Sequence, residues 1–269
     1  MFKFLITRTM GLIFLYGCSQ PPVKENVDIH KKNTNSVQNS HILNCVKKSG
    51  HHVYEKKMTC PLSGEDFTSL NLGTHSTSGK SLDWEPLSYM RFPVPLPVCP
   101  SNGFVMVETE YAEKRIEKIR TVIESEQYIE MYKHRHATYF LYAKTLELSG
   151  EETESQWWLY LNATWEADHC NDETRYKEYA LLVIEESKAR LTSLASNSEE
   201  FWVLSIVIPN MYRRIGEFDK ANKYLDGVGD PSLKNQNSNN FYSLAKRLLA
   251  TAIANNNSDR VAIREEEKT

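Results

Sequence analysis

The 269-residue sequence lacks the short motifs that mark the commonest catalytic and nucleotide-binding sites. It has no G-x-S-x-G elbow, no H-E-x-x-H, no P-loop and no G-x-G-x-x-G turn. It also has no basic excess, because the formal net charge is −3, so the charge footprint of a nucleic-acid-binding protein is missing. We therefore expect a protein that is not an enzyme, needs no cofactor or metal and binds no nucleic acid.

The apolar run near the N-terminus, TMGLIFLYG, is too short to span a bilayer as a stable helix. Lys3 and Arg8 make the preceding residues basic, and Leu15-Tyr16-Gly17-Cys18 follows. This order resembles a bacterial lipoprotein signal. The resemblance implies removal of residues 1–17 and lipid attachment at Cys18. Ser19 implies an outer-membrane location, facing the periplasm. The alternative is an N-terminus that is not a signal, which leaves a cytosolic zinc-binding protein.

Cysteines are few, and four remain beyond Cys18: Cys45, Cys60, Cys99 and Cys170. In an oxidising compartment an even set of thiols usually pairs. The spacing of these cysteines leaves all three possible connectivities open.

The composition changes along the chain and predicts distinct segments. Residues 18–50 have few large apolar side chains and predict a flexible tether. Residues 51–107 predict a small β-rich module, in which prolines at 93, 95 and 97 exclude a central strand. Apolar residues at three- and four-residue steps predict helices over 108–257, and 258–269 reads as a charged, frayed tail.

Short polar turns between the predicted helices indicate antiparallel hairpins stacked in an array. Gly150 predicts one helix end, and Ser196 with Glu199 predicts a capping box at the start of another. The stretch YRRIGEFDKA, residues 212–221, resembles the middle of a tetratricopeptide repeat, with a glycine turn and a small alanine between two helices.

Two cysteine turns complete a longer pattern. The order is TCPLSG at 59–64, WEPLSY at 84–89, VCPSNGF at 98–104, and then helices that contain YRRIGEFDKA. It resembles the bacterial family called Domain of Unknown Function 2225, which has two C-P-x-C-G knuckles followed by tetratricopeptide-like helices. The resemblance implies an α+β, predominantly α fold: a degenerate zinc-ribbon-like module, then a tetratricopeptide-like antiparallel helical array.

The resemblance also implies how the cysteines pair. Ser63 and Asn102 stand where the family has its second knuckle cysteines, so two of the four zinc ligands are missing. Because facing knuckles share one ion in the family, their remaining cysteines, Cys60 and Cys99, are implied to form a disulfide instead. Cys45 is then left to pair with Cys170. The alternative is a residual metal site, completed by one of three histidines: His51, His52 and His75.

Two classes of function follow. The first is a lipid-anchored envelope protein whose helical-array groove binds a protein or peptide partner, with Trp157 and Tyr160 as candidate groove residues. The second is an envelope enzyme or carbohydrate-binding protein that uses an aromatic groove. The first suits a sequence without catalytic motifs, and it is the function that we expect.

Overall fold

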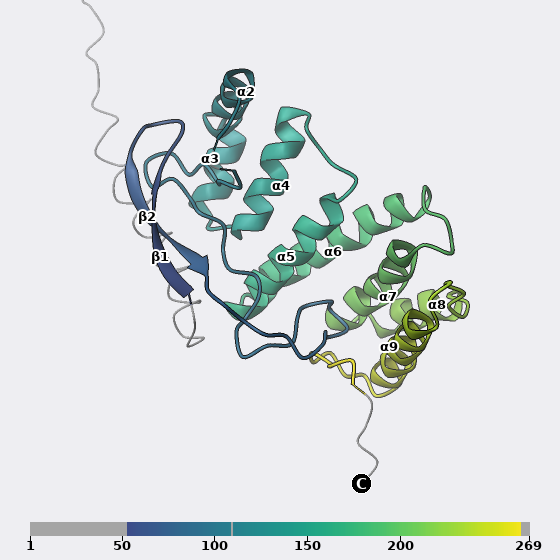
Figure 1. Cartoon of the computed structure of the whole chain (residues 1–269). Coiled ribbons are helices and arrows are strands. Elements are labelled where there is room, and N and C mark those ends of the chain that lie inside the picture. The colour runs from purple at the N-terminus through teal and green to yellow at the C-terminus, as the bar shows by residue number, and fades with distance from the viewer. Residues whose placement is uncertain (1–52, 109, 265–269) are drawn as a thin grey trace, which may run out of the picture.

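In a computed structural model, the structure describes residues 53–108 and 110–264 and is mostly helical (Figure 1). These residues contain 8 helices, giving 51% helix, and a two-stranded sheet. The predicted fold class, α+β and predominantly α, is confirmed at this level. The elements in chain order are β1 (Val53–Thr59), β2 (Asp66–Leu72), α2 (Glu113–Ile123), α3 (Glu126–Lys133), α4 (Thr138–Ser149), α5 (Gln156–His169), α6 (Glu173–Leu191), α7 (Glu199–Arg214), α8 (Phe218–Asp226) and α9 (Gln236–Ala254).

The expected β-rich module contains fewer strands than its name suggests. β1 and β2 form an antiparallel hairpin in which Val53 lies opposite Leu72. Between β2 and residue 107 the chain forms isolated bridges, such as Val98 with Val105. The prolines at 93, 95 and 97 carry no N–H and cannot donate to a ladder. Much of this module is therefore extended chain lying on the helices.

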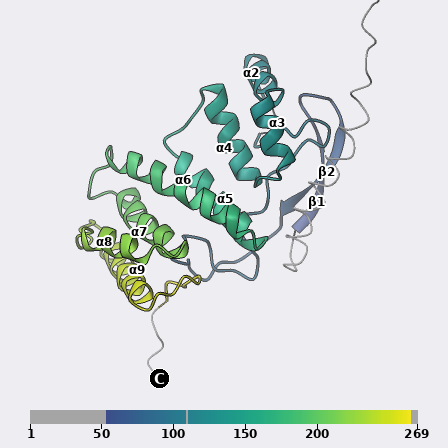
Figure 2. The same cartoon turned by 180° about the vertical axis from the view of Figure 1, so that it is seen from behind.

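The helices α2 to α9 form an array in which each helix packs on the next (Figures 1 and 2). Ala163, Ala180 and Ala221 are fully buried, and their small side chains allow the helices to approach closely. α4 separates two apolar cores. Phe140 belongs to the core of α5 to α9, whereas its neighbour Leu141 belongs to the core under the β module. None of the described helices is both long and apolar enough to cross a membrane.

Two helix ends test the local expectations. Gly150 ends α4 in the left-handed conformation, with φ 65°, as predicted. The predicted capping box is wrong, because Ser198 and not Ser196 caps α7. The Ser198 hydroxyl accepts a hydrogen bond from the backbone N–H of Phe201. Gly216, with φ 80°, joins α7 to α8 within the YRRIGEFDKA stretch.

Residues 80–97, which we call the crossing segment, turn back on themselves at 80–86, where Lys80 bridges to Pro86, and then run along the helices (Figure 1). At one end Trp84 packs against two rings of α9, those of Phe241 and Tyr242, each with its centroid 5.9 Å away. At the other end the backbone N–H of Leu96 donates to Thr138 Oγ1 at the start of α4, at 2.8 Å. The crossing segment thus contacts both α9 and α4, which are far apart in the order of the helices.

The C-terminal segment differs from the frayed tail that we expected. Ala262 forms a bridge with Ser81, and the backbone N–H of Leu82 donates to the Val261 carbonyl at 2.8 Å. Ile263 is buried. The prediction is therefore wrong for residues 258–264, since Val261 and Ile263 pack on the core and the backbone contacts to the crossing segment hold the chain in place. Residues 265–269 lie outside the described residues.

Candidate functional site

The two cysteine turns have the same local structure. In each turn the glycine four residues after the cysteine donates its N–H to the cysteine carbonyl, at 2.8 Å for Gly64 and 2.9 Å for Gly103. Both glycines have positive φ, 69° and 76°, a conformation that costs other residues free energy. CPLSG and CPSNG therefore form two equivalent turns.

Cys60 and Cys99 lie at disulfide distance between these turns, with their Cα atoms 5.6 Å apart, and both are fully buried. The amide Nδ2 of Asn102 lies 3.5 Å from Cys60 Sγ, so it fills space beside the sulfurs. His75 stacks edge-on against Phe92, with ring centroids 5.1 Å apart. Within residues 53–108 and 110–264, no three His, Cys, Asp or Glu side chains are grouped as a metal site.

The other predicted cysteine sites fall partly outside the structure. Cys18, the predicted lipid site, and Cys45 lie outside the described residues, as do the predicted signal peptide, 1–17, and tether, 18–50. Cys170 follows α5 directly as its C-terminal cap. The pair Cys45–Cys170 stays a prediction.

The two candidate groove residues, Trp157 and Tyr160, are core residues. They are 7% and 1% exposed, and both belong to the same core as Phe140. The Tyr160 hydroxyl donates to Glu147 of α4 at 3.2 Å. The prediction that they line a partner groove is therefore wrong. The reason is that α5 is covered by α4, by α6 and by the crossing segment, so most of its side chains are buried.

The neighbouring Trp158 lies at an open site instead. It is partly exposed and lines a groove of about 470 Å³, which we call the proline groove. One wall of this groove is the proline-rich part of the crossing segment, residues 92–97, and the other includes Leu70 and Leu72 of β2. The Trp158 ring packs edge-on against Trp165, with centroids 5.4 Å apart. The sequence analysis named Trp157, whereas its neighbour Trp158 is the tryptophan that lines the groove.

A buried charged cluster holds the middle of the crossing segment. Asp83 and Glu85 are 1% and 2% exposed. Asp83 pairs with Arg214 of α7 at 3.2 Å. Glu85 pairs with His169 of α5 at 3.0 Å and with Arg260 of the C-terminal segment at 2.8 Å. Because removing one partner of a buried pair leaves an uncompensated charge, these contacts fix the register of the crossing segment.

Asp168 extends the cluster from the end of α5. It pairs with Arg214 at 2.9 Å and with Arg260 at 2.5 Å. Burial on its own lowers the pKa of Arg214, but the attraction of Asp83, Tyr176 and Asp168 outweighs burial and raises that pKa. The guanidinium therefore stays charged inside the protein.

Asn210 connects this cluster to a second buried arginine. Its Nδ2 donates to Asp83 at 2.7 Å, and its Oδ1 accepts from Arg213 Nε and a second Arg213 nitrogen, at 3.0 and 2.7 Å. Arg213 is fully buried, and it also donates to the backbone carbonyls of Asn257 and Asp259. Burial lowers the pKa of Arg213. One amide thus supports contacts to the crossing segment and to the chain after α9.

Sequence reasoning missed this cluster. Asp83 and Asn210 are 127 positions apart, and no local pattern relates them. Arg213 and Arg214 were read as part of the helix turn in YRRIG. One signal was available, since Asn210 is a polar residue within the otherwise apolar run IVIPNMY.

Glu166 of α5 is a buried carboxyl group beside the start of α4. It accepts hydrogen bonds from the Thr138 hydroxyl at 2.6 Å and from the backbone N–H of Tyr139 at 3.2 Å. Ala137, at the N-cap of α4, has no side-chain cap, so Glu166 supplies the missing acceptors from another helix. Burial raises the pKa of Glu166 to about 7, although these hydrogen bonds oppose the rise.

Comparisons of the chain with known protein families, with curated proteins and with solved structures find no match. The resemblances that we describe therefore depend on the quoted motifs.

Proposed function

We propose that this protein is a lipid-anchored, non-catalytic binding protein of the bacterial cell envelope. Its lipid is carried by Cys18 and places it at the outer membrane, facing the periplasm. Its partner is an extended apolar segment of another protein, bound in the proline groove. The lipoprotein-like N-terminus supports the location, and the pairing of Cys60 with Cys99 suits an oxidising compartment.

The observation that carries the proposal is the proline groove itself. Its lining combines the indole of Trp158, the ring of Tyr139, and proline and leucine side chains. Prolines offer carbonyls but no N–H groups, so this wall binds through apolar contact and acceptors more than through a backbone ladder. Tryptophan and tyrosine supply large contact areas at little entropy cost, as in other peptide-binding surfaces.

The repeat-like helices support the proposal in a different way from the one that the sequence predicted. An array of tetratricopeptide type usually offers its own concave face to a partner. Here the crossing segment lies on the array and contributes its outer side to the proline groove. The degenerate zinc-ribbon ancestry belongs to the same proposal, with the disulfide in the place of the ion.

A screen of extended peptides against the oxidised full chain tests the groove. We expect apolar peptides to bind, Trp158→Ala and Leu72→Ser to weaken binding about tenfold or more, and Leu181→Ala to leave it unchanged. Leu181 is 47% exposed on α6 and does not line the groove, so it is a matched control. Equal binding by all three variants would remove the groove from the proposal.

A carbohydrate-binding function is the second candidate, since aromatic rings lie beside the amides of Asn71 and Asn162 in the same groove. A glycan array with the same variants separates the two. Glycan binding that depends on Trp158, without peptide binding, would favour this alternative. Mass spectrometry of the protein from native membranes tests the location: an intact Met1 and bound zinc would indicate the cytosolic alternative.

A further inference from the structure

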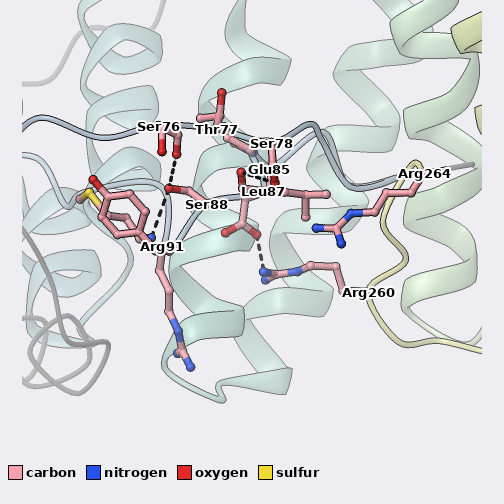
Figure 3. A pocket seen from close by; sticks show the side chains of 12 residues that line it. Ser76, Thr77, Ser78, Glu85, Leu87, Ser88, Arg91, Arg260 and Arg264 are labelled. Carbon is pink, nitrogen blue, oxygen red and sulfur yellow. Dashed lines mark hydrogen bonds and ion pairs between the residues drawn. The ribbon is translucent and has the colours of Figure 1, made fainter. Parts of the chain in front are cut away.

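A second pocket lies between residues 76–91 and the C-terminal segment, and it shares Pro86 with the lining of the proline groove (Figure 3). Its volume is about 540 Å³. Three arginines line it, Arg91 from the loop side and Arg260 and Arg264 from the C-terminal segment. We call it the arginine pocket. Serine and threonine hydroxyls at positions 76–78 lie on the same lining.

The charge of the arginine pocket is unbalanced. Glu85 is the one carboxylate among its described lining residues, and it already pairs with Arg260 and with His169. Arg91 and Arg264 are exposed and form no ion pair within the part of the chain that the structure describes. Among the described residues, these two guanidinium groups therefore have no carboxylate partner.

The inner wall has unused hydrogen-bonding capacity as well. Arg260 Nε is buried and has no acceptor among the described residues. Glu85 Oε2 lies 2.8 Å from the Arg260 guanidinium, but this contact is an ion pair without the alignment of a hydrogen bond. A buried donor without an acceptor is costly. An anionic oxygen placed at Arg260 Nε would satisfy this donor, and the positive charges of Arg91, Arg260 and Arg264 would oppose its repulsion from Glu85.

The two walls are held together by backbone contacts, so the pocket is built by the fold. The N–H of Ser78 donates to the Leu87 carbonyl at 2.8 Å, which closes the loop. The N–H of Ile263 donates to the Lys80 carbonyl at 2.9 Å, which ties the C-terminal segment to the loop. In Figure 3 the side chains of Arg260 and Arg264 lie on one side of Glu85, and that of Arg91 lies on the other.

We propose that the arginine pocket binds a phosphate group carried by a small polar molecule or by a lipid headgroup. A phosphate monoester is close to a dianion at neutral pH, which suits a lining that has three arginines and one carboxylate. Guanidinium donates paired hydrogen bonds to phosphate oxygens. The volume of the pocket exceeds that of a phosphate alone, and hydroxyl groups suit the polar body that carries it.

Titration calorimetry with inorganic phosphate and with glucose 1-phosphate tests the site on the oxidised full chain. We expect glucose 1-phosphate to bind more tightly than inorganic phosphate. Arg91→Gln and Arg264→Gln should each lower the affinity for glucose 1-phosphate about tenfold or more. Both side chains are exposed and unpaired in the described structure, so these variants should fold. Arg247→Gln, an exposed arginine on α9, is the matched control for net charge and should leave the affinity unchanged.

Vesicles distinguish the two sources of phosphate. Binding to phosphatidic acid vesicles but not to phosphatidylcholine vesicles, with the same loss in the two variants, would assign a lipid headgroup. Binding of the soluble sugar phosphate alone would assign a free ligand, and both results support the site. The proposal is overturned if no phosphate probe binds at about 10 mM. It is also overturned if Arg247→Gln weakens binding as much as the pocket variants.

Discussion

Replacing Glu166 with Gln should change how the stability of the protein depends on pH. Burial raises the pKa of Glu166 from the ordinary 4.5 to about 7. The folded protein therefore keeps a proton that the unfolded chain releases between these two values. The contribution of Glu166 to the free energy of unfolding is thus largest below pH 4.5 and declines as the pH rises to about 7.

The size of the effect follows from the linkage between protonation and folding. Each pH unit between the two pKa values changes the free energy of unfolding by about 1.4 kcal/mol. Over the interval from 4.5 to about 7, the loss is about 3 kcal/mol. Glutamine stays neutral at every pH and keeps an oxygen that accepts from Thr138 or from the N–H of Tyr139.

Urea denaturation at pH 4.5 and at pH 8 measures the effect. We expect the stability of Glu166→Gln, relative to the wild type, to be about 3 kcal/mol higher at pH 8 than at pH 4.5. Any effect of the substitution on packing that does not depend on pH cancels when the values at the two pH are subtracted. Glu124→Gln, at the exposed C-cap of α2, is the control and should show no such change. A Glu166→Gln variant that also shows none would refute a buried carboxyl with a raised pKa.

Three further predictions concern stability and are measured by the same denaturation assay. Replacing both Cys60 and Cys99 with Ala should lower the free energy of unfolding by about 4 kcal/mol, because the disulfide closes a loop with a separation of 39 residues. An unchanged urea midpoint would mean that the pair does not form. Gly64→Ala and Gly103→Ala should each lower the free energy of unfolding by about 1 kcal/mol or more, because alanine disfavours the positive φ of these positions. The loss should be distinctly larger for Gly103→Ala. A Cβ at position 103 would lie 2.9 Å from a tyrosine ring of α3, whereas at position 64 nothing lies within 4 Å; equal costs would contradict this packing. Asn210→Ala should cost about 3 kcal/mol or more, since it leaves a buried arginine and a buried aspartate without their shared partner. A loss below about 1 kcal/mol for Asn210→Ala would show that water takes over the hydrogen bonds of the amide.

The sequence predicted the features that depend on neighbouring residues. Helical periodicity identified the helical region, and glycine chemistry identified the end of α4 at Gly150. Prolines correctly excluded a central strand at 93–97. The capping residue of α7 was predicted wrongly because the capping-box pattern favours Ser196, with Glu199 three residues later, whereas the helix begins at Glu199 and Ser198 caps it.

The candidate site was less predictable, because exposure depends on which elements cover one another. Trp157 and Trp158 have the same chemistry and adjacent positions. One packs in the core and the other lines the proline groove, since α5 has neighbours on several sides. Local periodicity indicates a buried face, but it does not say that a distant extended segment will cover another face.

What the sequence alone determined is thus the class of fold and the short turns that follow Cys60 and Cys99. These follow from backbone preferences and hydrophobic spacing, which act over a few residues. The tertiary structure decided where the crossing segment lies, which charges are buried and which pockets stay open. Asp83 meets Arg214 only because the folded array brings distant parts of the chain together, and a buried charge has to find its partner wherever the packing places it.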